Sequence, residues 1–203
     1  KTSLFRIIRG EWIADGGSVE VPRHLRIGGV EQEAPASDDS LIETVLKADK
    51  ERASLFEDAE VATDPIRIAE IQIRLADIDA YSAEARASII LTGLGFNNEA
   101  QRRPCHEFSG GWRMRVALGA VLFSRPDILL LDEPTNYLDL EGSMWLENFL
   151  AKYQSTVLII SHDRALLNRA VSSILHLSHN KLTYYSGNYD RFDTERRMKL
   201  EQQ

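Results

Sequence analysis

The sequence predicts an α/β fold with a parallel or mixed sheet at its centre. Two apolar runs support this, Ile128–Leu131 (ILLL) and Thr156–Ile160 (TVLII), and a helical pattern around Leu140–Tyr153 separates them. Both runs are continuous rather than alternating, which is typical of strands buried on both faces of a parallel sheet. A buried helix is the alternative for ILLL, but Pro126 and Pro134 leave it too little length.

Composition and charge narrow the class of protein. The 203 residues are 43% hydrophobic and 27% charged, and no apolar run approaches the roughly 20 residues of a membrane-spanning helix. We expect no signal peptide at the start of the chain. The single cysteine, Cys105, excludes an internal disulfide and fits a reducing compartment, so we expect a cytoplasmic location. Residues 31–100 hold 16 acidic and 6 basic side chains, so that segment is not expected to lie on a nucleic-acid backbone.

The first forty residues read as a short helix followed by extended chain. A helix over Lys1–Arg9 stops at Gly10. Strand-like pieces follow at Ser18–Val21 (SVEV) and in LRIGGV, which leads into Glu31 and Gln32. APASDDS then predicts a loop.

The middle of the chain is helical and acidic. Apolar spacing predicts one helix from Leu41 to about Val61 and another from Asp64-Pro65 to near Tyr81. A further helix ends at Gly93 or Gly95. We interpret the middle as a subdomain inserted into the α/β core.

The last thirty residues predict a hairpin and a helix. SILHLS and KLTYYS, around Ser186-Gly187-Asn188, are typical of a terminal hairpin. Asn188–Gln203 predicts a charged helix with no obvious partner.

Polar residues with catalytic chemistry follow both buried strands. ILLL runs into Asp132 and Glu133, and TVLII runs into Ser161 and His162. Parallel strands present their carboxyl ends at one edge, so these side chains are expected to face one crevice. Of two adjacent carboxylates, one can hold hydrated magnesium while the other orients or deprotonates water. The alternative, a strand ending in a polar turn, explains either strand alone better than both together.

The chain opens with Lys1 and Thr2 before an apolar helix, which matches the end of the phosphate-binding loop G-x-x-x-x-G-K-[ST]. In that loop the lysine reaches the outer phosphates, the hydroxyl holds magnesium, and the helix N-terminus attracts the anion. The glycines of the loop are not in the sequence. The match is therefore informative only because a buried strand that ends in aspartate, ILLL followed by Asp132, lies downstream.

Four motifs in order resemble those of ABC-type ATPases. FSGGWRMR (Phe108–Arg115) resembles their signature loop, and ILLLDEPTNYLDL resembles their Walker B strand and D-loop. SHDR resembles the segment of their switch histidine, and Gln32 stands where their Q-loop lies. The resemblance implies a P-loop NTPase of ABC type, with a mixed or parallel sheet core and an inserted α-helical subdomain.

Details of these motifs resemble the ABC-F family, which consists of translation-associated ATPases without a membrane domain. Trp112 replaces the glutamine usual in transporters, and Asn136–Asp139 replaces their serine-alanine D-loop. YSGNYDRF before a charged helix fits the linker of that family. We expect a first-domain fragment divided at the following residues: 1–33, N-terminal core; 34–107, helical insertion; 108–187, signature helix and C-terminal core; 188–203, start of the linker helix.

The resemblance implies a role for each matching residue in binding and hydrolysing Mg-ATP. Lys1, Thr2 and Ser3 would bind phosphates, and Thr2, Gln32 and Asp132 would hold magnesium. Glu133 would be the catalytic base, with Gln32 touching the attacking water and His162 contacting the γ-phosphate.

The signature glycines would act on a different nucleotide from the other motifs. Ser109, Gly110, Gly111 and the D-loop residue Asp139 would contact ATP bound by a second ABC domain, in the same chain or a dimer mate, packed head to tail. The alternative is a structural role, in which the glycines at the start of the helix only allow close packing. Without the loop glycines and an upstream aromatic for adenine, we expect this stretch alone to bind nucleotide poorly and to be a weak or inactive ATPase.

The expected function is an ATPase domain whose closure acts on the ribosome, with the ribosome and its RNA as expected partners and no direct membrane insertion. The alternative is the nucleotide-binding subunit of an ABC transporter, against which the acidic 31–100 segment and the charged tail weigh. A non-hydrolysing interaction module is opposed by Glu133 and His162. A DNA-repair relative of the coiled-coil type would need a longer insertion.

Overall fold

The computed structural model describes residues 1–201, and residues 202 and 203 of the expected tail helix lie outside that part. Its described strands form two sheets. The central one is parallel, in the order β1 (Ile27–Gly29), β2 (Ile128–Asp132), β3 (Thr156–Ile160). The parallel core predicted from ILLL and TVLII is therefore confirmed. β4 (Ser173–Ser178) and β5 (Lys181–Ser186) form a separate antiparallel pair.

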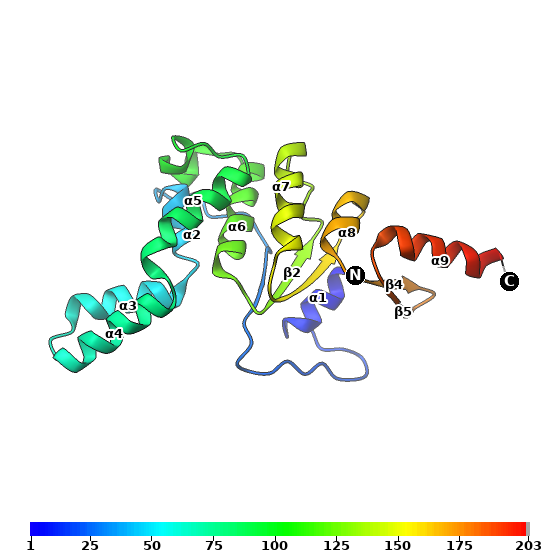
Figure 1. Ribbon diagram of the computed structural model, residues 1–203, viewed down its shortest axis with the longest axis horizontal. Coiled ribbons are helices and arrows are strands. Elements are labelled where there is room, and N and C mark those ends of the chain that lie inside the picture. Colours follow the sequence, from blue (N-terminus) through cyan, green and yellow to red (C-terminus); the bar gives the residue numbers. More distant parts are fainter. Residues whose placement is uncertain (202–203) are drawn as a thin grey trace.

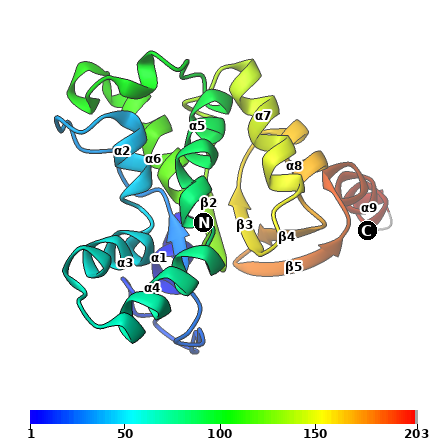
Figure 2. The same ribbon diagram turned by 60° about the vertical axis from the view of Figure 1, so that its left-hand side comes forward.

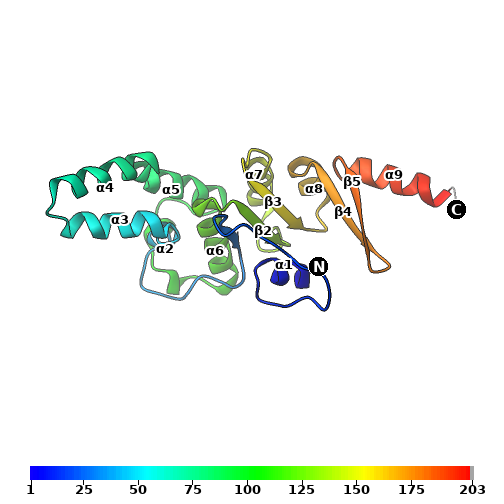
Figure 3. The ribbon, with the colours of Figure 1, turned by 90° about the horizontal axis from the view of Figure 1, so that it is seen from below.

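The α-helices of the described chain surround and extend this sheet. They are α1 (Thr2–Ile8), α2 (Leu41–Leu46), α3 (Lys50–Val61), α4 (Pro65–Asp77), α5 (Ala83–Gly93), α6 (Gly110–Ser124), α7 (Leu140–Ala151), α8 (Arg164–Ala170) and α9 (Tyr189–Glu201). Short 3₁₀ turns lie at Ala80–Ser82, Ala100–Arg102 and Cys105–Glu107. Helices α1 and α7 lie on opposite sides of the central sheet (Figures 1 and 3).

The molecule is elongated, with the sheet near its middle. The α3–α4 hairpin projects at one end and α9 lies at the other (Figure 1). Figure 2 shows α2, α5 and α6 gathered on one side of the sheet, and the β4–β5 pair beyond β3 on the side of α9.

A continuous apolar core joins the helical middle of the chain to the sheet. Leu41, Leu91 and Leu94 are fully buried with Leu129 and Leu146 in one cluster, so α2 and α5 pack into the same core as β2 and α7. The α3–α4 hairpin has a small cluster of its own around Ile71 and Leu75. The hairpin therefore extends from the body as a separately packed arm.

The prediction of one helix over residues 41–61 is wrong, because the chain bends between α2 and α3. Ser40 and Glu43 form a reciprocal capping box that starts α2. Asp49 then caps α3 by accepting a hydrogen bond from the Arg52 N–H at 3.0 Å. A second cap inside the apolar pattern starts a new helix there. Helix α4 ends at Asp77, a few residues before the predicted end near Tyr81. Helix α5 ends at Gly93, one of the two glycines predicted as its end.

Two other expectations need correction. Ser18–Val21 is not a strand, since Val19 is 49% exposed and the segment pairs with no other described backbone. The expected hairpin exists, but its two-residue turn is His179-Asn180, both with positive φ, which suits the twist of the strands.

The tail helix does have a partner. Phe192 of α9 is 5% exposed and packs on Tyr185 and His176 of the hairpin, with ring centroids 5.0 and 5.2 Å away. Burial there lowers the pKa of His176. One apolar side chain thus docks an otherwise charged helix. Among the described residues, no helix is long and apolar enough to cross a membrane.

Candidate functional site

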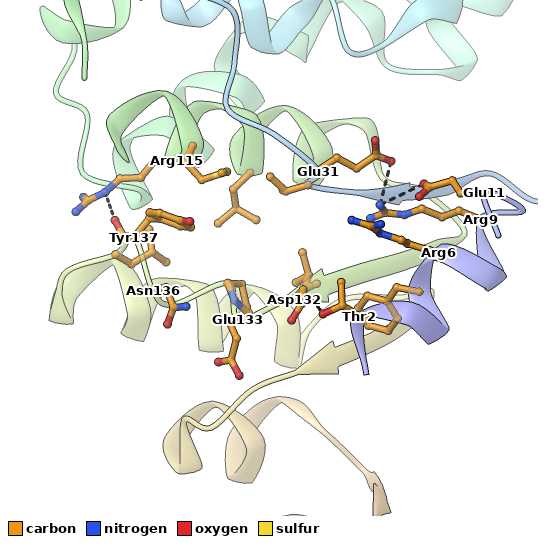
Figure 4. Close-up of a pocket in the computed structure, with 17 residues that line it drawn as sticks. Thr2, Arg6, Arg9, Glu11, Glu31, Arg115, Asp132, Glu133, Asn136 and Tyr137 are labelled. Carbon is orange, nitrogen blue, oxygen red and sulfur yellow. Dashed lines mark hydrogen bonds and ion pairs between the residues drawn. The ribbon is translucent and has the colours of Figure 1, made fainter. Parts of the chain in front are cut away.

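A cleft of about 360 Å³ lies at the carboxyl edge of the central sheet (Figure 4). Its walls come from α1, from the end of β1, from α6, and from the end of β2 with the loop behind it. Of the predicted site residues, Thr2, Asp132 and Glu133 line it. Lys1, Gln32, His162 and the Ser109–Gly111 segment lie outside its lining.

Thr2 and Asp132 meet although 130 residues separate them. The Thr2 hydroxyl donates a hydrogen bond to Oδ2 of Asp132 over 2.5 Å (Figure 4). A hydroxyl and a carboxylate oxygen are the hard donors that magnesium prefers. Among the described residues no three His, Cys, Asp or Glu side chains form a metal-binding group. The other ligands of a cation here would therefore be of other kinds, such as an amide oxygen, water or a bound molecule.

Glu133 stands in a strained backbone conformation beside the end of β3. Its φ of 46° is left-handed, which is uncommon for a residue with a Cβ. Its N–H donates to the Ile160 carbonyl over 2.8 Å, and its Oε2 accepts from the His162 N–H over 3.3 Å. Parallel register thus brings the two strand ends together, as expected from the sequence.

The side chains of Glu133 and His162 also face one another. Nε2 of His162 lies 3.4 Å from Oε1 of Glu133, an ion pair when the imidazole carries a second proton. The imidazole is 86% exposed, whereas the Glu133 side chain is 24% exposed. His162 can therefore reach a ligand without leaving the carboxylate.

The signature segment lies at the surface. Ser109 precedes α6 and makes no capping hydrogen bond with its side chain, and both Ser109 and Gly111 are exposed. A Cβ added to Gly111 would meet only open space. A Cβ on Gly110 would lie 2.3 Å from Oε2 of Glu33, so a side chain at this position would displace the Glu33 carboxylate.

Asp139 has a structural role at the start of α7. Its Oδ1 accepts the Gly142 N–H over 2.8 Å, and its Oδ2 lies 3.0 Å from Nη1 of Arg115. The Gly142 hydrogen bond, with the Arg115 contact second, holds the pKa of Asp139 below its ordinary value.

Three arginines of the site were missed from the sequence. Arg115 is 12% exposed, donates to the Tyr137 carbonyl over 2.5 Å and to the Leu94 carbonyl over 3.2 Å, and stacks on Trp112. Arg113 and Arg9 contact the residues around Gln32. For Arg113 and Arg115 the available signal was their place directly after the signature glycines.

Comparison with known proteins shows the family to which the chain belongs. The family model described as ABC transporter matches residues 1–136. The chain is 44% identical over 206 residues to the probable ATP-binding protein YheS of Haemophilus influenzae, covering all of the chain and 32% of that protein. It is 43% identical over 211 residues to human ATP-binding cassette sub-family F member 3, covering 98% of the chain and 29% of that protein.

Solved structures share the fold at lower identity. An RNase-L inhibitor matches with a TM-score of 0.62 and 21% identity over 96% of this chain and 34% of that one. MJ0796, a bacterial ABC transporter cassette, matches with a TM-score of 0.52 and 22% identity over 81% of this chain and 64% of that one. The chain spans about a third of the length of the curated relatives it matches. It belongs to the ABC transporter family.

Proposed function

We propose that this chain is the ATP-hydrolysing domain of a cytoplasmic ABC-F protein whose nucleotide-driven domain closure acts on the ribosome. The main support is the cluster at the carboxyl edge of β2 and β3. There the Thr2 hydroxyl contacts the Asp132 carboxylate, and the Glu133 carboxylate next to it contacts the His162 imidazole. The resemblance of the motifs to the ABC-F family, and the identity with ATP-binding cassette sub-family F member 3, support the translational role, as do the D-loop and tail residues that differ from those of transporters.

In this proposal the start of α1 holds the phosphates. Lys1 and Ser3 act with Thr2, whose hydroxyl, together with Gln32 and Asp132, holds the magnesium of Mg-ATP. The 2.5 Å contact between Thr2 and Asp132 supports this, because both oxygens already point to one place. Bound magnesium neutralises charge that develops on the phosphates.

Glu133 acts as the catalytic base. Its carboxylate accepts a proton from the attacking water, while the His162 N–H and imidazole hold it in orientation. The exposed imidazole of His162 is free to contact the γ-phosphate. The left-handed backbone of Glu133 supports this assignment, since strained conformations concentrate at functional sites.

Ser109, Gly110 and Gly111 serve the nucleotide of a second ABC domain, with Asp139 on the same face. Their support is the uncapped, exposed start of α6, whose amides can bind an anion. MJ0796, which has the same fold, is dimeric in its solved structure. ATP held in this way joins two domains head to tail, and hydrolysis releases them.

The division of the chain follows from these roles. We propose that 1–33 and 108–187 form the ATPase core, that 34–107 is the helical insertion, and that 188–203 begins a linker helix to a second domain. The projecting α3–α4 arm and the α9 helix at the opposite end support this division (Figure 1).

ATP turnover and ribosome co-sedimentation of the complete protein test the proposal. We expect Glu133→Gln to reduce turnover by about 10²-fold or more, the range of a lost general base, while ATP still binds and the closed form accumulates on ribosomes. Glu57→Gln, at an exposed position of α3, is the matched control and should leave turnover unchanged. Normal turnover after Glu133→Gln would remove the assignment of the base.

A further inference from the structure

Gln32 has no interaction of its own that fixes its position. It lies at a bend after β1, it is exposed, and within residues 1–201 its side chain makes no hydrogen bond. Its neighbours on both sides are glutamates, Glu31 and Glu33. The side chains of these two glutamates, together with the backbone of Ala34, make the contacts that fix the loop around Gln32.

Glu31 is held by the helix that starts at Thr2. Nη1 of Arg9, at the end of α1, donates to Oε1 of Glu31 over 2.9 Å (Figure 4). The Arg9 side chain is 15% exposed and crosses β1 so closely that a Cβ on Gly29 would lie 2.2 Å from its Nη2. The guanidinium is therefore confined, and it ties Glu31 to α1.

Glu33 is held by the signature helix. Nη2 of Arg113 donates to Oε1 of Glu33 over 2.6 Å, and its Nε and Nη1 donate to the carbonyls of Ala34 and Phe108 over 3.1 and 2.7 Å. The Ala34 N–H in turn donates to the Arg113 carbonyl over 3.1 Å. The Arg113 side chain is only 17% exposed, and its contacts attach the Gln32 loop to α6.

Glu33 also touches the first residue of the signature helix. Its Oε2 occupies the space that a side chain at Gly110 would need, at 2.3 Å. The residue after Gln32 is thus in contact with the Ser109–Gly111 segment. In the proposed function these two elements serve different nucleotides, so this contact connects the two sites.

These ion pairs contribute little to folding. The Glu31 and Glu33 side chains are 61% and 45% exposed, and pairs at such exposed positions are weakened by solvent and salt. Their effect is instead to restrict where the loop can lie, and misplacement of a catalytic group by about 1 Å can reduce a rate by about 10²-fold. Because the arginines come from α1 and α6, the position of Gln32 depends on the spacing between those helices.

We infer that Arg9 and Arg113 are positioning residues that hold Gln32 between α1 and α6 through Glu31 and Glu33, and that the Glu33–Gly110 contact links its placement to the signature segment. This inference rests on the proposed function. It makes Gln32 responsive to the arrival of a second domain on Ser109–Gly111, because a shift of α6 moves Glu33.

Steady-state ATP turnover of the complete protein tests the inference in a double-mutant cycle. Glu31→Ala combined with Glu33→Ala is compared in the natural background and in a Gln32→Ala background. We expect kcat to fall about fivefold or more in the first and less than about twofold in the second, within the range that mispositioning produces. We expect KM for ATP to rise in the natural background as well, because Gln32 holds the magnesium of Mg-ATP in the proposed function, and to stay constant in the Gln32→Ala background. Asp58→Ala, which removes an exposed 2.9 Å pair with Arg67, is the matched control.

Each outcome decides something. Equal losses of kcat in both backgrounds, or no loss in the natural one, overturn the inference, because the pairs then do not act through Gln32. An unaffected kcat after Gln32→Ala alone also overturns it. No turnover by the unmodified protein instead refutes the proposed function itself. Circular dichroism shows whether the double alanine variant is folded. If it is not, the double variant Glu31→Gln with Glu33→Gln, which keeps the side-chain size, is used in the same cycle.

Discussion

Removing the Arg115 side chain should loosen the loop between β2 and α7. In the structure Arg115 donates to the carbonyls of Tyr137 and Leu94 and pairs with Asp139. A hydrogen bond from a charged donor contributes about 1.5 kcal/mol or more, and a pair with a 55% exposed carboxylate at most about 1 kcal/mol. Because neighbouring contacts are not additive, we expect Arg115→Ala to lower the free energy of unfolding by about 3 kcal/mol.

Urea unfolding of the complete protein measures this loss, and hydrogen–deuterium exchange over residues 134–142 localises it. Arg67→Ala is the control, because that arginine is 52% exposed and pairs only at the surface of the arm, so its loss should stay below about 1 kcal/mol. If Arg115→Ala costs no more than the control, or if exchange rises elsewhere and not in this loop, the reasoning about Arg115 is wrong.

Three further predictions concern stability and protonation. Leu131→Ala, at a fully buried position directly before Asp132, should lower the free energy of unfolding by about 2–5 kcal/mol in urea titration. The folded pKa of Asp139 lies below its ordinary 3.8, so its stabilisation is complete above about pH 4 and is lost as the pH falls; Asp139→Asn should make acid unfolding less steep. Burial raises the pKa of Tyr153 to about 12, so its contribution is present below pH 10 and is lost as the pH rises, and Tyr153→Phe should remove a phenolate absorbance step near pH 12.

The sheet and its polar edge were predictable because they depend on local patterns. Continuous apolar runs specify buried parallel strands, and such strands end at one edge, so Asp132, Glu133 and His162 could be placed together from the sequence. The same reasoning does not reach Thr2, whose contact with Asp132 depends on how α1 packs across the sheet. The expectation that Thr2 lies near Asp132 came from the motif resemblance and not from hydrophobic periodicity.

Boundaries and side-chain partners were harder to predict, for identifiable reasons. A helical stripe does not reveal that Asp49 caps a new helix, because caps compete with continued propensity. Val19 has strand propensity but no backbone to pair with. The docking of α9 depends on one buried aromatic, Phe192, within a strongly charged sequence. Each of these outcomes is decided by tertiary contacts.

The signature helix emerges as the element that couples the loops of the site. Arg113 and Arg115 are two positions apart, which places them about 200° apart around the helix axis, so they face opposite sides. Arg113 holds the residues after Gln32, and Arg115 holds the Tyr137–Asp139 loop. A displacement of α6 therefore cannot leave either loop unchanged. Since Ser109–Gly111 forms the start of this helix, a ligand bound there would contact the same helix that holds both loops.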